Sequence, residues 1–80
     1  MALSKAEVLA GLAELVNDET GIATDSVQLD KSFSDDLDID SISMITIVMN
    51  AEEKFGVTIP QDSSFVTVGE AVDFIVAAQG

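Results

Sequence analysis

The chain has 80 residues, the size of one small domain whose single hydrophobic core is only just sufficient for stability. Its Asp and Glu residues number 15 against 3 basic residues, and the formal net charge of −12 excludes nucleic acids and anionic membranes as partners while favouring basic protein surfaces. Cysteine is absent, which excludes disulfides and thiolate metal sites, so the hydrophobic 48% of the chain must supply the core.

The first predicted element is an amphipathic helix over residues 5–18. Ser4 and Glu7 have the S-x-x-E spacing of a capping box, and Gly21 is a stop signal beyond the last turn. The apolar residues that recur with helical period are Val8, Leu9, Leu12, Leu15 and Val16. This pattern predicts one buried helix face.

Residues 22–40 are predicted to form a long loop, because they are rich in Asp, Ser and Thr and show no sustained helical period. The apolar side chains expected to hold this loop on the core are Val27, Leu29, Phe33 and Leu37. A loop of this length is uncommon in a compact domain and is often functional.

A second helix is predicted over residues 41–55, with Asp38 or Asp40 near its N-cap and Gly56 at its end. Residues 57–60 are expected to be extended, since Pro60 disfavours helix in the residue before it. Asp62 is a candidate cap for one short helical turn.

That short turn is expected to end at Phe65. Thr67 and Glu70 then repeat the capping-box spacing and predict a closing helix to about Ala78. Its apolar face consists of Val68, Ala71, Val72 and Ile75. The predicted fold is all-α: a small bundle of three to four helices, with a long loop between the first two. We expect one domain over residues 1–80 and a monomer.

Enzymatic catalysis is disfavoured, because neither His nor Cys is present to act as general base or nucleophile. Asp36, Asp38 and Asp40 match the first three ligands of an EF-hand loop. The match fails at Ser41, which takes the turn-glycine position, and at Ile47, which takes the position of the bidentate Glu. We therefore predict no dedicated metal site, although weak association of divalent ions with the acidic cluster stays open.

No segment approaches the roughly 20 apolar residues that span a bilayer, and the N-terminal residues lack the apolar region of a signal peptide. We therefore expect a soluble, cytoplasmic protein.

Residues 35–44, Asp-Asp-Leu-Asp-Ile-Asp-Ser-Ile-Ser-Met, resemble the prosthetic-group site of acyl carrier proteins, whose signature is Asp-Ser-Leu at the start of the second helix. Here the tripeptide is Asp40-Ser41-Ile42, in which Ile42 replaces the usual Leu. The resemblance continues through Glu-Glu-Lys-Phe at residues 52–55, Ile-Pro at 59–60 and Thr-Val at 67–68. The Leu-Asp-Ile-Asp-Ser form is similar to discrete actinobacterial fatty-acid carriers. The segment between residues 60 and 67 is short for the family, which leaves a third helix in doubt.

The resemblance implies that Ser41, beside Asp40, is the attachment point for a 4′-phosphopantetheine arm taken from coenzyme A. The arm's thiol would carry acyl groups as thioesters for fatty-acid synthase enzymes, after loading by a phosphopantetheinyl transferase. A phosphodiester at this position would lie near a helix N-terminus, where backbone N–H groups favour an anion. The competing interpretation is that Ser41 only caps the helix.

Two other functions remain open. A carrier for polyketide or nonribosomal peptide synthesis would share the fold, the serine and the arm, and a domain cut from a larger synthase would give the same sequence pattern. From a different class, an unmodified acidic adaptor or a divalent-ion-binding domain would use the cluster at residues 36–40.

The second helix carries two apolar stripes, although a surface helix needs only one. The stripe expected to face the core consists of Met44, Ile47, Val48, Ala51 and Phe55. We interpret the other as the centre of a docking patch for basic partner enzymes, formed by Ile42, Ile45 and Met49 with the surrounding acids Asp36, Asp38, Asp40, Glu52 and Glu53. The alternative is that the preceding loop covers the second stripe.

Carriers of this family shelter their acyl chains between helices, and Ala51 is a small residue in the middle of the predicted inner face. We therefore expect a compressible acyl pocket bordered by Phe33, Ile47, Ala51, Phe65 and Val72. Ordinary core packing is the alternative.

Overall fold

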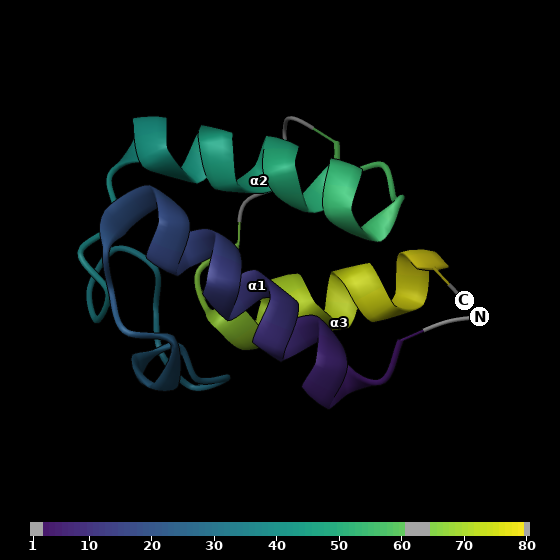
Figure 1. Cartoon of the computed structure of the whole chain (residues 1–80), viewed down its shortest axis with the longest axis horizontal. Helices are drawn as coiled ribbons and strands as arrows, with labels where there is room; N and C mark the ends of the chain where they lie inside the picture. The colour runs from purple at the N-terminus through teal and green to yellow at the C-terminus, as the bar shows by residue number, and fades with distance from the viewer. Residues whose placement is uncertain (1–2, 61–64, 80) are drawn as a thin grey trace.

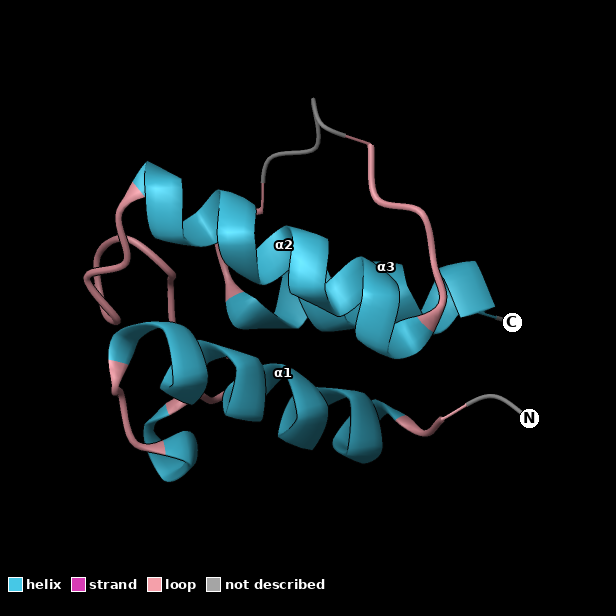
Figure 2. Cartoon of the chain, turned by 45° about the horizontal axis from the view of Figure 1, so that its top comes forward, coloured by secondary structure: helices cyan, strands magenta, loops and turns pink. Residues whose placement is uncertain are grey.

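The computed structural model describes residues 3–60 and 65–79, which form three α-helices and one short 3-10 turn (Figure 1). The elements are α1 (Lys5–Thr20), η1 (Thr24–Ser26), α2 (Ser41–Phe55) and α3 (Val68–Gln79). Within these residues the only β-type pairing is an isolated bridge between Ser32 and Thr67. The predicted all-α class is confirmed, and Figure 2 shows how much of the connection between α1 and α2 is loop.

Local caps set the ends of α1. The Ser4 N–H donates to Glu7 Oε1 at 2.9 Å and the Glu7 N–H donates to Ser4 Oγ at 3.2 Å, which is the predicted capping box. The helix continues two residues beyond the expected end, because Thr20 is helical and its hydroxyl donates to the Val16 carbonyl at 2.7 Å. Gly21 then adopts φ 82°, a left-handed conformation that ends the helix.

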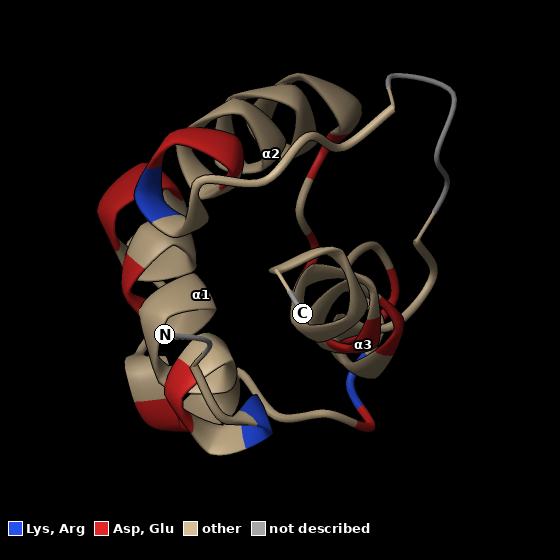
Figure 3. Ribbon diagram, turned by 90° about the vertical axis from the view of Figure 1, so that its right-hand side faces the viewer, with Lys and Arg blue, Asp and Glu red and all other residues tan. Residues whose placement is uncertain are grey.

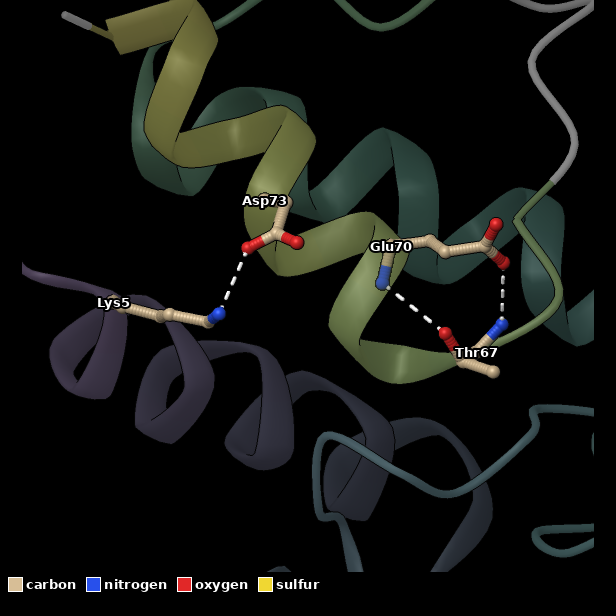
Figure 4. A network of polar contacts seen from close by, with 4 residues as sticks. All are labelled: Lys5, Thr67, Glu70 and Asp73. Atoms are coloured by element: carbon tan, nitrogen blue, oxygen red, sulfur yellow. Dashed lines mark hydrogen bonds and ion pairs between the residues drawn. The ribbon is translucent and has the colours of Figure 1, made fainter.

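The other two helices also begin and end as predicted. The Asp40 side chain caps α2 and Gly56, at φ 66°, ends it. At the start of α3 the Glu70 N–H donates to Thr67 Oγ1 at 3.2 Å and the Thr67 N–H donates to Glu70 Oε1 at 2.9 Å, a second capping box (Figure 4). Helices α1 and α3 therefore begin with the predicted reciprocal pairs, and Asp40 rather than Asp38 caps α2.

Helix α1 packs against both α2 and α3, so its inner side chains form the centre of the core. Val8 and Val16 are fully buried, and Leu12 is 2% exposed. At Gly11 an added Cβ would lie 2.8 Å from the Phe55 ring, so α1 and α2 approach closely where α1 has no side chain. Buried side chains from the loops belong to the same core cluster: Val27, Phe33, Leu37, Ile39, Val57 and Ile59.

The long loop is held on the core as predicted, with Val27, Phe33 and Leu37 buried and Leu29 half-buried. Backbone hydrogen bonds also join it to the residues that lead into α3. Phe33 N–H donates to the Val66 carbonyl at 3.0 Å, Val68 N–H to the Lys31 carbonyl at 2.9 Å, and Gly69 N–H to the Leu29 carbonyl at 2.9 Å. Residues 29–33 are therefore fixed by a segment more than thirty positions away.

Residues 57–60 have no helix, as predicted, and Val57 and Ile59 are buried. The short turn expected from Asp62 falls on residues 61–64, which lie outside the described part of the chain. The beginning of the described chain lies close to its end (Figure 1), and Gln79 Nε2 donates a hydrogen bond to the Leu3 carbonyl at 2.7 Å. A Lys5–Asp73 ion pair of 3.1 Å also joins α1 to α3 (Figure 4). None of the helices described is long and apolar enough to cross a membrane.

Candidate functional site at the start of α2

Ser41 is the first residue of α2 and its side chain is exposed. The capping position belongs to Asp40, whose Oδ1 accepts a hydrogen bond from the Ser43 N–H at 2.7 Å. The interpretation that Ser41 merely caps the helix is therefore wrong, because the preceding carboxylate already does so. The Ser41 hydroxyl is presented to solvent at the first turn, where free backbone N–H groups favour a bound anion.

Hydrogen bonding keeps the Asp40 carboxyl ionised. The backbone N–H of Ser43 lowers the pKa of Asp40 below its ordinary value of 3.8, with the Ser43 side chain adding to the effect. The carboxylate beside Ser41 is therefore negatively charged at neutral pH. It stabilises the end of the helix and contributes to the acidic surface around it.

A compact turn fixes the chain ahead of this site. Ser32, which is 8% exposed, donates its N–H to Asp36 Oδ2 at 2.8 Å, while its Oγ accepts the N–H groups of Asp35 and Asp36, each at 3.2 Å. The Ser32 backbone bond is the main reason why the pKa of Asp36 is lowered. One oxygen of the Asp36 carboxylate is therefore hydrogen-bonded within the loop, so Asp36 is less available to a partner protein than the sequence suggested.

Asp38 is the one non-glycine residue with positive φ, 55°, among the residues described. Just beyond it, the Ile39 N–H donates to the Phe33 carbonyl at 2.9 Å and the Ile39 side chain is buried. The left-handed conformation of Asp38 turns the chain into this buried anchor, just before α2 begins. Asp tolerates that conformation better than most residues do.

The three alternate aspartates do not converge on a point. Two of them, Asp36 and Asp40, bind backbone N–H groups on different turns. In residues 3–60 and 65–79 no group of three or more carboxylates is arranged to hold a metal ion.

The second apolar stripe of α2 faces solvent. Ile42 is 75% exposed, Ile45 60% and Met49 61%, so the interpretation in which the long loop covers this stripe is wrong. The opposite face is the inner one, where Ile47 and Ala51 are buried and Met44, Val48 and Phe55 are half-buried. Acidic residues stand just before α2, at Asp40, and near its C-terminal end, at Glu52 and Glu53, while the middle of the helix is uncharged and tan in Figure 3.

A groove runs along α2 between these two faces, with a cavity volume of about 590 Å³. Its α2 side is formed by Ser41, Met44, Ile45, Val48, Met49 and Glu52, and the opposite side by Phe33, Ser34, Ile39, Ile59, Pro60 and Phe65. The groove begins at the candidate serine. Sequence reasoning did not identify it, although the spacing of the α2 residues by three and four positions marks one edge of the helix.

Next to the groove, and sharing part of its lining, is a small void of about 10 Å³. Four of the five expected pocket residues border it, namely Phe33, Ile47, Ala51 and Phe65. Val72 does not, because Ala71 and Ile75 take the side of α3 that faces the void, and Val72 is turned by roughly 100° from Ala71. Val72 is instead fully buried elsewhere in the core.

Glu52 and Glu53 differ in their surroundings. Glu52 is half-buried, borders the groove, and accepts a hydrogen bond from the Ile59 N–H at 2.9 Å. Glu53 is exposed. Of these two acids, Glu53 is the one whose carboxylate is available at the surface.

Comparison with known proteins accounts for this arrangement. Residues 10–75 match the family described as a phosphopantetheine attachment site. The chain is 68% identical to the acyl carrier protein of Beutenbergia cavernae over 99% of each chain, and 63% identical to that of Tropheryma whipplei over 99% of each. Among solved structures, the acyl carrier protein from Enterococcus faecalis superposes with a TM-score of 0.76 at 35% identity, covering 95% of this chain and 99% of that one.

Proposed function

The chain belongs to the acyl carrier protein family, and from this membership and the geometry of α2 we propose that Ser41 carries the family's phosphopantetheine arm. An acyl carrier is not itself a catalyst: it is the substrate of a transferase and the partner of synthase enzymes in fatty-acid synthesis. Its prosthetic group is 4′-phosphopantetheine, bound covalently, whose thiol holds acyl groups as thioesters.

The observation that carries the proposal is the division of roles between adjacent residues. The Asp40 carboxylate accepts the Ser43 N–H in the first turn of α2, which leaves the neighbouring Ser41 exposed and without a capping role. In the loading reaction Ser41 Oγ forms a bond to the pantetheine-bearing phosphorus of coenzyme A. The pyrophosphate bond breaks, adenosine 3′,5′-bisphosphate leaves, and the serine proton is released. The new phosphodiester then lies at the N-terminal end of α2.

We propose that the exposed stripe of Ile42, Ile45 and Met49 is the centre of the docking patch. These three side chains are mostly solvent-exposed and lie on the same helix as Ser41. Asp38 and Glu53 supply exposed negative charge before and after them. Partner enzymes with basic surfaces would be steered by these charges and held by the apolar centre.

We also propose that the acyl chain enters the groove and not a cavity already open in the core. The small void of about 10 Å³ is no larger than the space that a single water molecule needs. The groove is far larger, is lined mainly by apolar side chains and begins at Ser41. A long chain that pushed deeper would have to displace side chains that border both spaces, which are Phe33, Met44, Val48, Ile59 and Phe65.

Loading tests the attachment site directly. The protein is incubated with coenzyme A, magnesium and a phosphopantetheinyl transferase, and its intact mass is measured. We expect a gain of one phosphopantetheine that is lost in Ser41→Ala and kept in Ser43→Ala, which removes a hydroxyl from the same turn. No gain in the unmodified sequence, or a gain that survives Ser41→Ala, contradicts the proposal.

The remaining proposals concern the oligomeric state, the cellular location and the extent of the domain. We propose that the chain acts as a monomer in the cytoplasm, as one carrier domain over residues 1–80.

A further inference from the structure

Glu52 is the one charged side chain among the described residues that line the groove. Its neighbours there are apolar: Met49 and Val48 from α2, and Ile59 and Pro60 from the opposite side. Glu52 lies eleven residues after Ser41 on an unbroken helix, which is about 16 Å along the axis at 1.5 Å per residue. The groove thus begins at the attachment serine and has a carboxylate near its other end.

The position of this carboxylate is fixed by both backbone and packing. Glu52 Oε2 accepts the Ile59 N–H at 2.9 Å, and the Ile59 side chain is 5% exposed. Glu52 is itself half-buried. Its charge is therefore held at the wall of the groove instead of swinging freely in solvent.

The nearest cation along α2 does not neutralise Glu52. Lys54 pairs with Glu14 of α1 at 3.6 Å, and the other ion pair in the described part of the chain joins Lys5 to Asp73. A second negative charge brought to this end of the groove would face Glu52 in partly desolvated surroundings, where repulsion between like charges is stronger than in water.

We propose that Glu52 makes the groove selective for the far end of the acyl chain: it accepts an uncharged alkyl end and rejects an end that bears a carboxylate. The inference rests on the proposed function, in which the groove receives the chain carried on Ser41. An alkyl chain gains from burial against the apolar walls. A carboxylate-ended chain would have to lose hydration next to Glu52, so it stays in solvent and its thioester remains accessible.

Matched cargoes separate the two cases. A phosphopantetheinyl transferase loads the protein from octanoyl or suberoyl coenzyme A, which have the same chain length and differ in that the suberoyl chain ends in a carboxylate. The longer pair, decanoyl and sebacoyl coenzyme A, is used in the same way. The thermal midpoint of each acylated form is compared with that of the protein that bears the unacylated arm. We expect the alkyl members to raise the midpoint and the carboxylate-ended members to leave it unchanged. Alkaline hydrolysis of the thioester should follow the same order, slow for the alkyl members and fast for the others.

Two glutamine variants assign the effect to one residue. Glu52→Gln keeps an oxygen acceptor for the Ile59 N–H but removes the charge, so the suberoyl and sebacoyl forms should now show the rise in midpoint. Glu53→Gln makes the same charge change one position along, at an exposed residue that does not line the groove, and should leave the discrimination as it is.

Equal stabilisation by both cargo classes in the unmodified sequence, or an equal effect of the two glutamine variants, overturns the inference. If Glu52→Gln does not fold, the hydrolysis rates of the unmodified protein decide: a suberoyl thioester as protected as the octanoyl one overturns it. Failure of the proposed function looks different. No stabilisation by any cargo would contradict the groove as an acyl site and this inference with it, and no mass gain at Ser41 would contradict the attachment.

Discussion

Asp40 and Ser41 are adjacent residues, and the sequence alone does not decide which of them caps α2, since either side chain is a good helix cap. The structure separates them, because only the Asp40 carboxylate bonds to the Ser43 N–H. The prediction of a cap at Asp38 or Asp40 came from residue type and spacing, which are local. Which of the two residues caps depends on the path of the loop, and this in turn depends on the buried anchor at Ile39.

Asp38 tests the loop backbone at the level of one residue. Its φ of 55° is tolerated by Asn and Asp but costs other non-glycine residues roughly 1 kcal/mol. We therefore expect Asp38→Ala to lower the free energy of unfolding by about 1 kcal/mol, and Asp38→Asn to leave it nearly unchanged. Urea unfolding of the two variants measures the difference. Equal stabilities would mean that the charge, and not the left-handed backbone, decides what this position accepts.

At the scale of elements, the three helices were predictable because their caps and stop glycines lie within a few residues of the helices they bound. The groove was not, because its two sides come from α2 and from Phe33, Ile59 and Phe65, which only the tertiary fold brings together. The same holds for the backbone bonds between residues 29–33 and 66–69. Val72, expected at the acyl pocket, borders neither the groove nor the small void for a related reason: helical period predicts a buried face but not which neighbour each side of that face meets.

Gly69 tests the junction between the long loop and α3. An added Cβ would lie 2.9 Å from the Leu29 carbonyl oxygen, the same atom that accepts the Gly69 N–H. Because this is backbone that cannot rotate away, we expect Gly69→Ala to destabilise the fold by roughly 1–3 kcal/mol. In an open helix the same change stabilises by about 1 kcal/mol. A rise in the thermal midpoint would therefore contradict the close approach.

The docking patch proposed on α2 makes a kinetic prediction. Glu53→Lys should slow loading by the transferase at low salt, and the difference should shrink at high salt as the charges are screened. Glu53 is a cleaner probe than Glu52, whose replacement by Lys would also remove the bond to Ile59. Glu19→Lys makes the same charge change at an exposed position on α1. Equal slowing by the two variants would assign the effect to net charge and contradict a local patch.

For the whole molecule, the acidic composition acts in two opposite directions as pH falls. Protonation relieves repulsion within a chain of net charge −12. It also weakens the hydrogen bonds of four carboxylates whose pKa values are lowered in the fold by backbone N–H donors. These four residues are Glu7, Asp36, Asp40 and Glu70.

Glu70 shows the sign of the second effect. The Thr67 N–H, followed by the Val66 N–H, lowers the pKa of Glu70 from its ordinary value of 4.5, so the unfolded chain takes up the proton first on acidification. The stabilisation is complete above the ordinary value and is lost as pH falls through the lowered one. We expect the gap in thermal midpoint between the unmodified protein and Glu70→Gln to narrow over that range. A gap that is constant down to strongly acid pH would contradict this cap, and Glu19→Gln controls for the change in net charge.

The central claim is that a chain carried on Ser41 lies in the groove along α2. The most direct measurement compares side-chain methyl NMR spectra of the protein bearing the unacylated arm with those of its octanoyl form. The account predicts large shifts for Ile45, Val48, Met49 and Ile59, which line the groove, and small shifts for Val8 and Val16, which are fully buried on α1. Shifts concentrated on Val8 and Val16, or no shifts at all, would contradict it.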